Sequence, residues 1–222
     1  MPDRNFDIDF TYRGNEAYRN AFEEAFEEAA KRWEQIITAD LPDVGRVPDV
    51  GRVDDIFIKA RVIEIDGKGD FLGEARTTYV RNDSGLPLKG IMEFDKADIR
   101  EMSNDGILTD TIMHEMGHVL GLGTLWDTSY FDFVNYERGG YTGENALQEY
   151  RRLSGDSSAT YVPLETGGGR GTAYDHWSED VFDVEMMTGY SNGDHPISRV
   201  TIGALEDLGY TVSYAQADPY HL

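Results

Sequence analysis

The first half of the chain alternates between segments with the two-residue period of strands and a segment with the longer period of a helix. Residues 6–12 and the stretch Ile56–Ile65 predict two strands. Two more strands are predicted at Gly73–Val80 and Pro87–Asp95. Residues 16–37 carry apolar side chains on one side of a helix that is long enough to lie along a sheet. This order of elements predicts a mixed sheet with helices packed on it.

A second helix is predicted after the last of these strands. Its apolar stripe repeats at spacings of four and three residues and consists of Leu108, Ile112, Met116 and Val119. Asn104 or Asp105 would serve as its N-cap, and Gly121 would end it. One side of this helix is expected to pack on a core, which leaves the opposite side facing a cleft.

The second half of the chain has a different character. Residues 122–175 are rich in Gly, Ser, Asp, Asn and Tyr, and one short helix is predicted there, at Glu144–Leu153. A further helix is predicted at Ile197–Leu208, started by Pro196 or Ser198. Together the two halves predict an α+β fold with a mixed twisted sheet, long helices and an irregular C-terminal lobe.

A short tandem duplication separates the first helix from the second strand. Pro42–Val47 and Pro48–Val53 have the same sequence, Pro-Asp-Val-Gly-Arg-Val. Two copies are too few for a repeat architecture, so we expect an extended surface loop.

Composition limits the function classes. The 222 residues are 40% hydrophobic, which suffices for one domain with a sizeable core. A net charge of −22 makes nucleic acids and anionic membranes poor partners, and we expect a solvated acidic surface that suits a salt-rich habitat. No apolar run is long enough to span a membrane, and the start of the chain shows no signal-peptide pattern.

The run His114-Glu115-Met116-Gly117-His118 on the predicted second helix has the pattern H-E-x-x-H. Residues four positions apart lie on one face of a helix, so His114 and His118 can bind one metal ion. Glu115 stands beside the first histidine and can take a proton from a water at that metal. Since the chain has no cysteine, histidines and carboxylates are the strong zinc ligands that remain.

A catalytic zinc usually has three protein ligands and one open position. The common continuation H-E-x-x-H-x-x-G-x-x-H matches at Gly121 but would place the third ligand at Thr124. The remaining candidates are a downstream glutamate and three histidines, His176, His195 and His221. His195 lies in a turn-like loop and His221 at the chain end, whereas His176 follows a glycine-rich loop that can fold back on the motif helix.

The segments that follow the motif stand in an order typical of one protein family. Gly121, a long insertion, His176-Trp177 and then Glu185-Met186-Met187-Thr188-Gly189 resemble the leishmanolysin-like branch of the metzincin metallopeptidases. The tail Ser198–Tyr210 is similar to the closing helix of that family. The resemblance covers residues 87–215 and, by element order alone, the N-terminal part.

The resemblance implies a metzincin-type, zincin-like fold with a zinc ion held by His114, His118 and His176. It also implies that Glu115 is the general base and that Met187, with Met186 as the alternative, forms the methionine turn beneath the zinc. Tyr190 follows Met187 one position later than the tyrosine that some metzincins place near zinc, so we expect it to line the wall of the cleft. The cysteine that keeps some metzincins latent is absent.

The resemblance further implies one catalytic domain over residues 1–222, with an N-terminal lobe of residues 1–123 and a C-terminal lobe of residues 124–222. An extended protein substrate would pair with a cleft-side edge strand, which we expect at Lys89–Phe94. Residues 187–197 would shape the pocket after the scissile bond.

A second cation is suggested by Asp66, Asp70 and Glu74, which flank a glycine loop. Their spacing loosely suggests calcium but does not fit the EF-hand pattern, so a plain turn with solvated acids is favoured.

The predicted function is that of a zinc-dependent endopeptidase, acting as an extracellular monomer on protein or peptide substrates. Two alternatives stay open. One is a catalytically silent zinc- or calcium-loaded binding or adhesion module on the same fold, although a silent module has no need of Glu115 beside the metal. The other is a zinc hydrolase that acts on a non-peptide amide or ester, because a fold does not fix the substrate.

Overall fold

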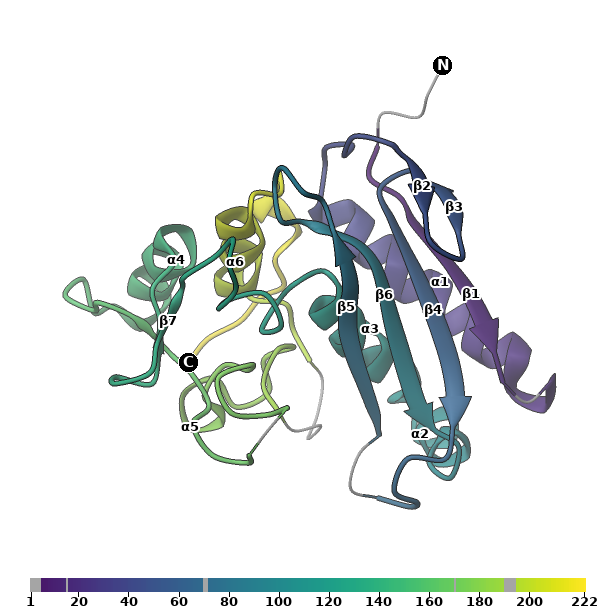
Figure 1. The fold of residues 1–222 in the computed structure, drawn as a ribbon. Helices are drawn as coiled ribbons and strands as arrows, with labels where there is room; N and C mark the ends of the chain where they lie inside the picture. Colours follow the sequence, from purple (N-terminus) through teal and green to yellow (C-terminus); the bar gives the residue numbers. More distant parts are fainter. Residues whose placement is uncertain (1–4, 15, 70–71, 170, 190–194) are drawn as a thin grey trace. The chain divides into compact units, whose positions relative to one another are not determined.

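The computed structural model describes residues 5–14, 16–69, 72–169, 171–189 and 195–222. The chain forms two compact units, Met1–Leu120 and Gly121–Leu222 (Figure 1). The first unit contains a mixed sheet with helices, and the second contains short strands and helices joined by long loops. The predicted α+β class with a mixed sheet is confirmed.

The sheet of the first unit has four strands in the order β1-β4-β6-β5. β1 (Ile8–Arg13), β4 (Ile56–Ile63) and β6 (Pro87–Asp95) run parallel, and β5 (Gly73–Val80) is antiparallel to β6. The predicted bounds of β5 and β6 are confirmed, while β1 and β4 differ slightly from the prediction at their ends.

The expectation that Lys89–Phe94 forms an edge strand is wrong. These residues belong to β6, which pairs with β4 on one side and β5 on the other. Nearly all residues of β6 are buried, as is typical of a strand in the middle of a sheet. Hydrophobic alternation reports which face of a strand is buried but not which strands lie beside it. The edges of this sheet are β1 and β5.

Two helices, α1 (Arg19–Ile36) and α3 (Leu108–Val119), pack on one face of this sheet and on each other (Figure 1). α1 follows a short 3-10 helix, η1 (Glu16–Tyr18), and buries the side that carries Phe22, Phe26 and Trp33. Phe22 meets Phe94 of β6 edge to face, with ring centroids 5.1 Å apart. This aromatic layer fills the space between helix and sheet.

Three contacts hold the backbone of α3 against its neighbours. Trp33 Nε1 of α1 donates a hydrogen bond of 3.0 Å to the carbonyl of Met113. Thr77 Oγ1 of β5 donates a hydrogen bond of 3.1 Å to the carbonyl of Val119, the last residue of the helix. A β-carbon at Gly90 of β6 would lie 2.3 Å from Val119 Cγ1, so this glycine allows the helix to approach the sheet closely.

The start of α3 differs from the prediction. Asn104 and Asp105, which are expected as N-caps, instead end a short additional helix, α2 (Ile99–Asp105). Gly106 has a φ of 78° in the left-handed region, which lets the chain end α2 and begin α3 at once. The N-cap of α3 is Ile107, whose side chain makes no capping bond. Packing therefore stabilises this helix more than capping does.

The tandem duplication forms a hairpin, so the prediction of an extended loop is wrong. The first copy contributes β2 (Val44–Val47) and the second contributes β3 (Gly51–Val53), and the two strands pair antiparallel. Val47 and Val53, the last residues of the two copies, are buried in one cluster with Leu88 of β6. Repeating the same residues thus supplies both strands and both buried valines of the hairpin.

Buried aromatic rings form the centre of the second unit. Its short strands β7 (Val134–Asn135), β8 (Gly140–Tyr141) and β9 (Val162–Pro163) make a three-stranded sheet. The largest buried rings are Trp126, Tyr141 and Trp177. Their centroids lie between 4.6 and 5.4 Å apart, so these rings form one packed cluster among the loops.

The helices of the second unit are α4 (Glu144–Ser154), α5 (Glu179–Phe182) and α6 (Arg199–Leu208), followed by the 3-10 helix η2 (Tyr214–Gln216). Ser198 is the N-cap of α6, because its side chain accepts hydrogen bonds from two backbone N–H groups of the first turn. Of the two predicted starts, Ser198 is therefore the correct one. Among the described residues, no helix is long and apolar enough to cross a membrane.

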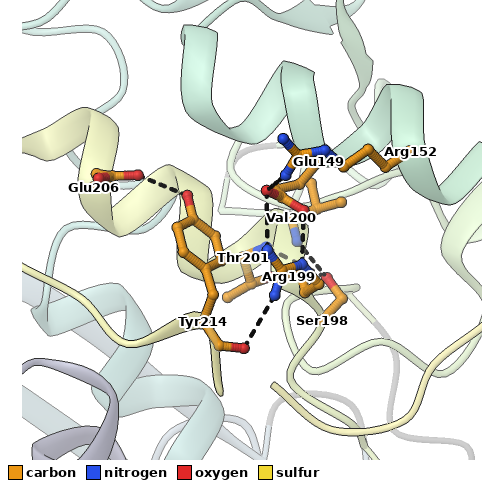
Figure 2. A network of polar contacts seen from close by, with 8 residues as sticks. All are labelled: Glu149, Arg152, Ser198, Arg199, Val200, Thr201, Glu206 and Tyr214. Carbon is orange, nitrogen blue, oxygen red and sulfur yellow. Dashed lines mark hydrogen bonds and ion pairs between the residues drawn. The ribbon is translucent and has the colours of Figure 1, made fainter. Parts of the chain in front are cut away.

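A network of charged side chains joins α4, α6 and η2 (Figure 2). Glu149 of α4 is 3% exposed, accepts a hydrogen bond of 2.7 Å from Arg199 Nε and pairs with Arg152. Arg199 Nη1 donates to the carbonyl of Tyr214, and its guanidinium lies 4.6 Å from the centroid of the Tyr214 ring. The hydroxyl of Tyr214 donates in turn to Glu206 of α6. The buried carboxylate of Glu149 is thus paired with positive charge, which its burial requires.

Asp95, the last residue of β6, organises the loop that follows β4. Its Oδ2 accepts hydrogen bonds of 2.8–3.1 Å from the backbone N–H groups of Ile65, Asp66 and Gly67, and its Oδ1 accepts one from Ala97. Burial alone would raise the pKa of this carboxyl. The four N–H donors outweigh that effect and lower its pKa from 3.8 to about 2.

Because the pKa of Asp95 is lower in the folded chain than in the unfolded chain, its contribution to stability is complete above about pH 4 and is lost as the pH falls toward about 2. We expect Asp95→Asn to lower the free energy of unfolding by about 1–3 kcal/mol at neutral pH, and this difference to shrink below pH 4. Urea denaturation at several pH values measures both effects. The exposed Asp83→Asn should show neither, and a pH-independent difference for Asp95→Asn would contradict the assignment.

Gly90→Ala tests the close approach of α3 to the sheet. The added methyl group overlaps Val119, so the variant should lose about 1–3 kcal/mol of unfolding free energy in urea denaturation. Gly45→Ala is the matched control, since a β-carbon there meets no atom within 4 Å. Equal stability of the two variants would show that the helix does not depend on this contact.

Candidate metal centre

The helix α3 presents two imidazoles on one face. His114 and His118 stand one turn apart, and their Nε2 atoms lie 3.1 Å from each other. Their rings meet edge to face, at an interplanar angle of 86°. Two nitrogens bound to one tetrahedral zinc would lie about 3.3 Å apart, given zinc–nitrogen bonds of about 2.0–2.1 Å. The two histidines therefore have the geometry of a zinc-binding pair.

His176 lies in the loop between β9 and α5 and is 5% exposed. Its Nδ1 lies 3.1 Å from the carbonyl oxygen of Thr172. A carbonyl can only accept, so Nδ1 carries the proton and Nε2 keeps its lone pair for a metal. Histidine ligands of zinc commonly have such a carbonyl partner, which fixes the tautomer and the ring orientation.

Among the described residues, one group of histidine and acidic side chains could hold a metal ion, and it consists of His114, His118 and His176. Each offers one ring nitrogen, and these three atoms lie within 4.8 Å of one another. Three neutral imidazoles suit zinc and leave a fourth position for water. The other candidate ligands, His195 and His221, are not part of this group.

A close backbone contact holds the segment before His176. Gly123 has a φ of 74°, and a β-carbon there would lie 2.1 Å from the carbonyl oxygen of Asp175. On the other side, Glu165 donates its backbone N–H to the carbonyl of His176 over 2.9 Å. The third histidine thus sits on a loop whose backbone is held from two sides.

The segment Glu185–Gly189 is tied to the same loop. Trp177 donates its backbone N–H to the carbonyl of Met187 over 3.0 Å, and a β-carbon at Gly189 would lie 3.7 Å from His176 Cγ. Both Met186 and Met187 are buried. The chain therefore brings the methionine pair alongside the residues that carry the third histidine.

The carboxylate of Glu185 fixes this turn. It is fully buried and accepts hydrogen bonds from the N–H groups of Met187 and Ser198 and from Thr201 Oγ1, at distances of 2.5–2.9 Å. Burial raises the pKa of Glu185 against the opposing effect of these donors. With its oxygens engaged in this way, Glu185 holds the turn against the start of α6 instead of binding a metal.

Glu115 is 7% exposed and packs against the start of β5, where a β-carbon at Gly73 would lie 3.3 Å from Glu115 Cγ. Its Oε2 has no hydrogen-bond partner among the described residues. Burial, followed by the nearby charge of Glu74, raises its pKa to about 8. A zinc cation bound beside it would oppose this rise.

Comparison with known proteins decides the family. The family profile described as leishmanolysin, a peptidase family, matches residues 56–220. The chain belongs to the leishmanolysin family. Membership confirms the predicted resemblance, the metzincin-type fold and a zinc centre formed by His114, His118 and His176.

Similar members of the leishmanolysin family are found in distant organisms. The chain is 30% identical to a leishmanolysin homolog of Crithidia fasciculata over 60% of its own length, and 26% identical to leishmanolysin of Leishmania donovani over 71%. It is 40% identical to a leishmanolysin-like peptidase of Drosophila melanogaster over 25% of its length. The matches cover 21%, 28% and 8% of these relatives, respectively, so the chain corresponds to a part of each.

Two of the predicted site residues, Tyr190 at the cleft wall and Asp70 at the suggested calcium site, lie outside the described residues. Asp66 and Glu74 belong to no group of three metal-binding side chains among the described residues. The calcium site therefore remains a prediction without structural support.

Gly123 and Glu185 position the centre in ways that the sequence pattern does not reveal. A signal for Gly123 exists in the pair of glycines directly after the motif helix, at positions 121 and 123. For Glu185, the signal is an acid inside a run that is otherwise expected to be buried. Neither signal identifies its contact without the fold.

Gly123→Ala should weaken zinc binding by about tenfold or more, because the added methyl group displaces the backbone beside His176. Gly155→Ala is a matched control, since its φ of 72° is nearly the same but a β-carbon there meets nothing within 4 Å. Competition with a chromogenic chelator measures both affinities. An equal loss of zinc affinity in the two variants would show that backbone strain alone causes the weaker binding.

Proposed function

We propose that this chain is a zinc-dependent endopeptidase that hydrolyses peptide bonds of extended protein substrates. The observation that carries the proposal is the buried, unpartnered Oε2 of Glu115, next in sequence to a zinc ligand. Burying a carboxylate in this way is unfavourable for stability, and a silent zinc module gains nothing from it. The family of the chain supports the same reaction class.

Glu115 acts as the general base in this proposal. Zinc, when bound by the three histidines, polarises the substrate carbonyl and lowers the pKa of a water. Glu115 Oε2 accepts the proton of the attacking water and later delivers it to the leaving amine.

We assign Met187 to the methionine turn, with Met186 as the alternative. Its carbonyl accepts the N–H of Trp177, the residue after the third ligand, which supports this choice. The residues that shape the neighbouring pocket, predicted at 187–197, include 190–194, which lie outside the described residues.

The substrate binds along β5 in place of the predicted β6. Among the described strands, β5 pairs with β6 alone, so its other edge can add a substrate strand by backbone hydrogen bonds. A β-carbon at Gly73 would lie 3.3 Å from Glu115 Cγ, so the start of this strand lies near the proposed general base.

The domain organisation, oligomeric state and location of the enzyme are proposed as well. Residues 1–222 contain all three ligands and the base, so we propose that they form one catalytic domain. We propose a monomer that acts outside the cell. Its strongly acidic composition favours protein substrates over nucleic acids as partners.

Cleavage of fluorescently labelled casein tests this proposal. The wild-type chain should cleave casein, lose activity with a zinc chelator and regain it when zinc is added. Glu115→Gln should lower kcat/KM by about 10²–10⁴-fold with one zinc still bound. Glu64→Gln, at a glutamate whose side chain is 86% exposed, should behave like wild type. Loss of zinc in Glu115→Gln would show that Glu115 is a structural residue and would contradict its assignment as the general base.

A further inference from the structure

The hydroxyl of Thr201 lies in the first turn of α6, whose N-cap Ser198 accepts the backbone N–H of the same residue (Figure 2). The side chain of Thr201 is fully buried. Trp177 Nε1 donates a hydrogen bond of 2.8 Å to Thr201 Oγ1. An indole N–H can only donate, so the hydroxyl proton of Thr201 is left for a second partner. That partner is Glu185, whose Oε1 accepts the hydroxyl over 2.5 Å.

These two bonds complete a closed ring of hydrogen bonds. Glu185 Oε2 accepts the backbone N–H of Met187 over 2.7 Å, and the carbonyl of Met187 accepts the backbone N–H of Trp177 over 3.0 Å. The ring thus consists of Trp177, Thr201, Glu185 and Met187, and all four residues are fully buried. Water does not replace a lost partner in such a site, so each bond of the ring supports the others.

The hydrogen-bonded ring adjoins the third zinc ligand, because Trp177 directly follows His176. The indole of Trp177 packs on Trp126 and Tyr141, with ring centroids 4.6 and 5.4 Å away. A side chain packed in this way is held in one place by its neighbours. The bond to Thr201 adds a direction to this packing, since the indole N–H has to point at the hydroxyl. The backbone that carries the imidazole of His176 is therefore oriented by the indole and by the N–H of Trp177 together.

We propose that Thr201 is a positioning residue of the zinc centre, which holds His176 in its metal-binding orientation through Trp177. Glu185 fixes the direction of the Thr201 hydroxyl, and the hydroxyl fixes the indole. A ligand that is already oriented binds its metal with a smaller loss of conformational entropy. Residues that orient zinc ligands from behind commonly contribute a factor of about 10–100 to metal affinity. The inference concerns metal binding and does not depend on the proposed endopeptidase activity.

Competition with a chromogenic chelator measures the zinc affinity of variants at position 201. Thr201→Val removes the hydroxyl from a side chain of similar shape, so its zinc dissociation constant should rise about tenfold. Thr201→Ser keeps the hydroxyl and should keep the wild-type affinity. The visible absorption bands of the cobalt-loaded chain report the geometry of the metal ligands. These bands should change in Thr201→Val and match the wild type in Thr201→Ser.

Tyr141→Phe is the control, because it removes a different hydrogen bond of the second unit, from the buried Tyr141 hydroxyl to Asp207, and keeps the aromatic ring. Like Thr201→Val, it should lower the melting temperature of the metal-free chain, but it should leave zinc affinity and the cobalt bands unchanged. If Thr201→Val does not fold, Thr201→Ala removes the same hydroxyl and takes its place in the comparison with Thr201→Ser.

Three results would overturn the inference. One is a variant without the hydroxyl that is less stable but keeps the wild-type zinc affinity and cobalt bands, since Thr201 would then be structural alone. The others are a loss of affinity in Tyr141→Phe or in Thr201→Ser equal to that in the variant without the hydroxyl. A failure to cleave casein would contradict the proposed function and leave this inference standing.

Discussion

The close packing of α3 on the sheet is the constraint on which the centre depends. Two zinc ligands, His114 and His118, and the neighbouring Glu115 lie within five residues of this helix, so the orientation of the helix sets the orientation of all three side chains. The Trp33 bond to Met113, the Thr77 bond to Val119 and the glycine at position 90 fix the helix at its middle and its end. A core helix held in this way needs no N-cap, and Ile107 provides none.

The third ligand is held by different means, since it comes from a loop. His176 is oriented by the carbonyl of Thr172, and its segment is held by the backbone contact between Asp175 and Gly123. The buried carboxylate of Glu185 connects the backbone of Met187 to Ser198 at the start of α6. A long irregular segment thus gains order from a few buried polar bonds and an aromatic cluster rather than from regular secondary structure.

The sequence predicts the parts of this molecule that depend on local periodicity. The bounds of β5 and β6, the body of α3 and the histidine pair follow from spacing alone. Strand order does not follow from spacing, because hydrophobic alternation does not show which strands lie side by side. The position of Lys89–Phe94 inside the sheet is therefore visible only in the fold. The hairpin of the duplication depends on tertiary packing, since its buried valines Val47 and Val53 lie in one cluster with Leu88. His176 stands far from the motif in sequence, so spacing alone leaves it one of several candidates.

X-ray absorption spectroscopy of the zinc-loaded chain tests whether the three histidines hold one zinc ion, because it counts and identifies the ligands of the metal. We expect one zinc per chain with three imidazole nitrogens at about 2.0–2.1 Å and one further oxygen from water. Removing His176 should leave two imidazoles in the spectrum. A shell closed by four protein ligands, or one that keeps three imidazoles without His176, would show that these three histidines do not form an open zinc centre.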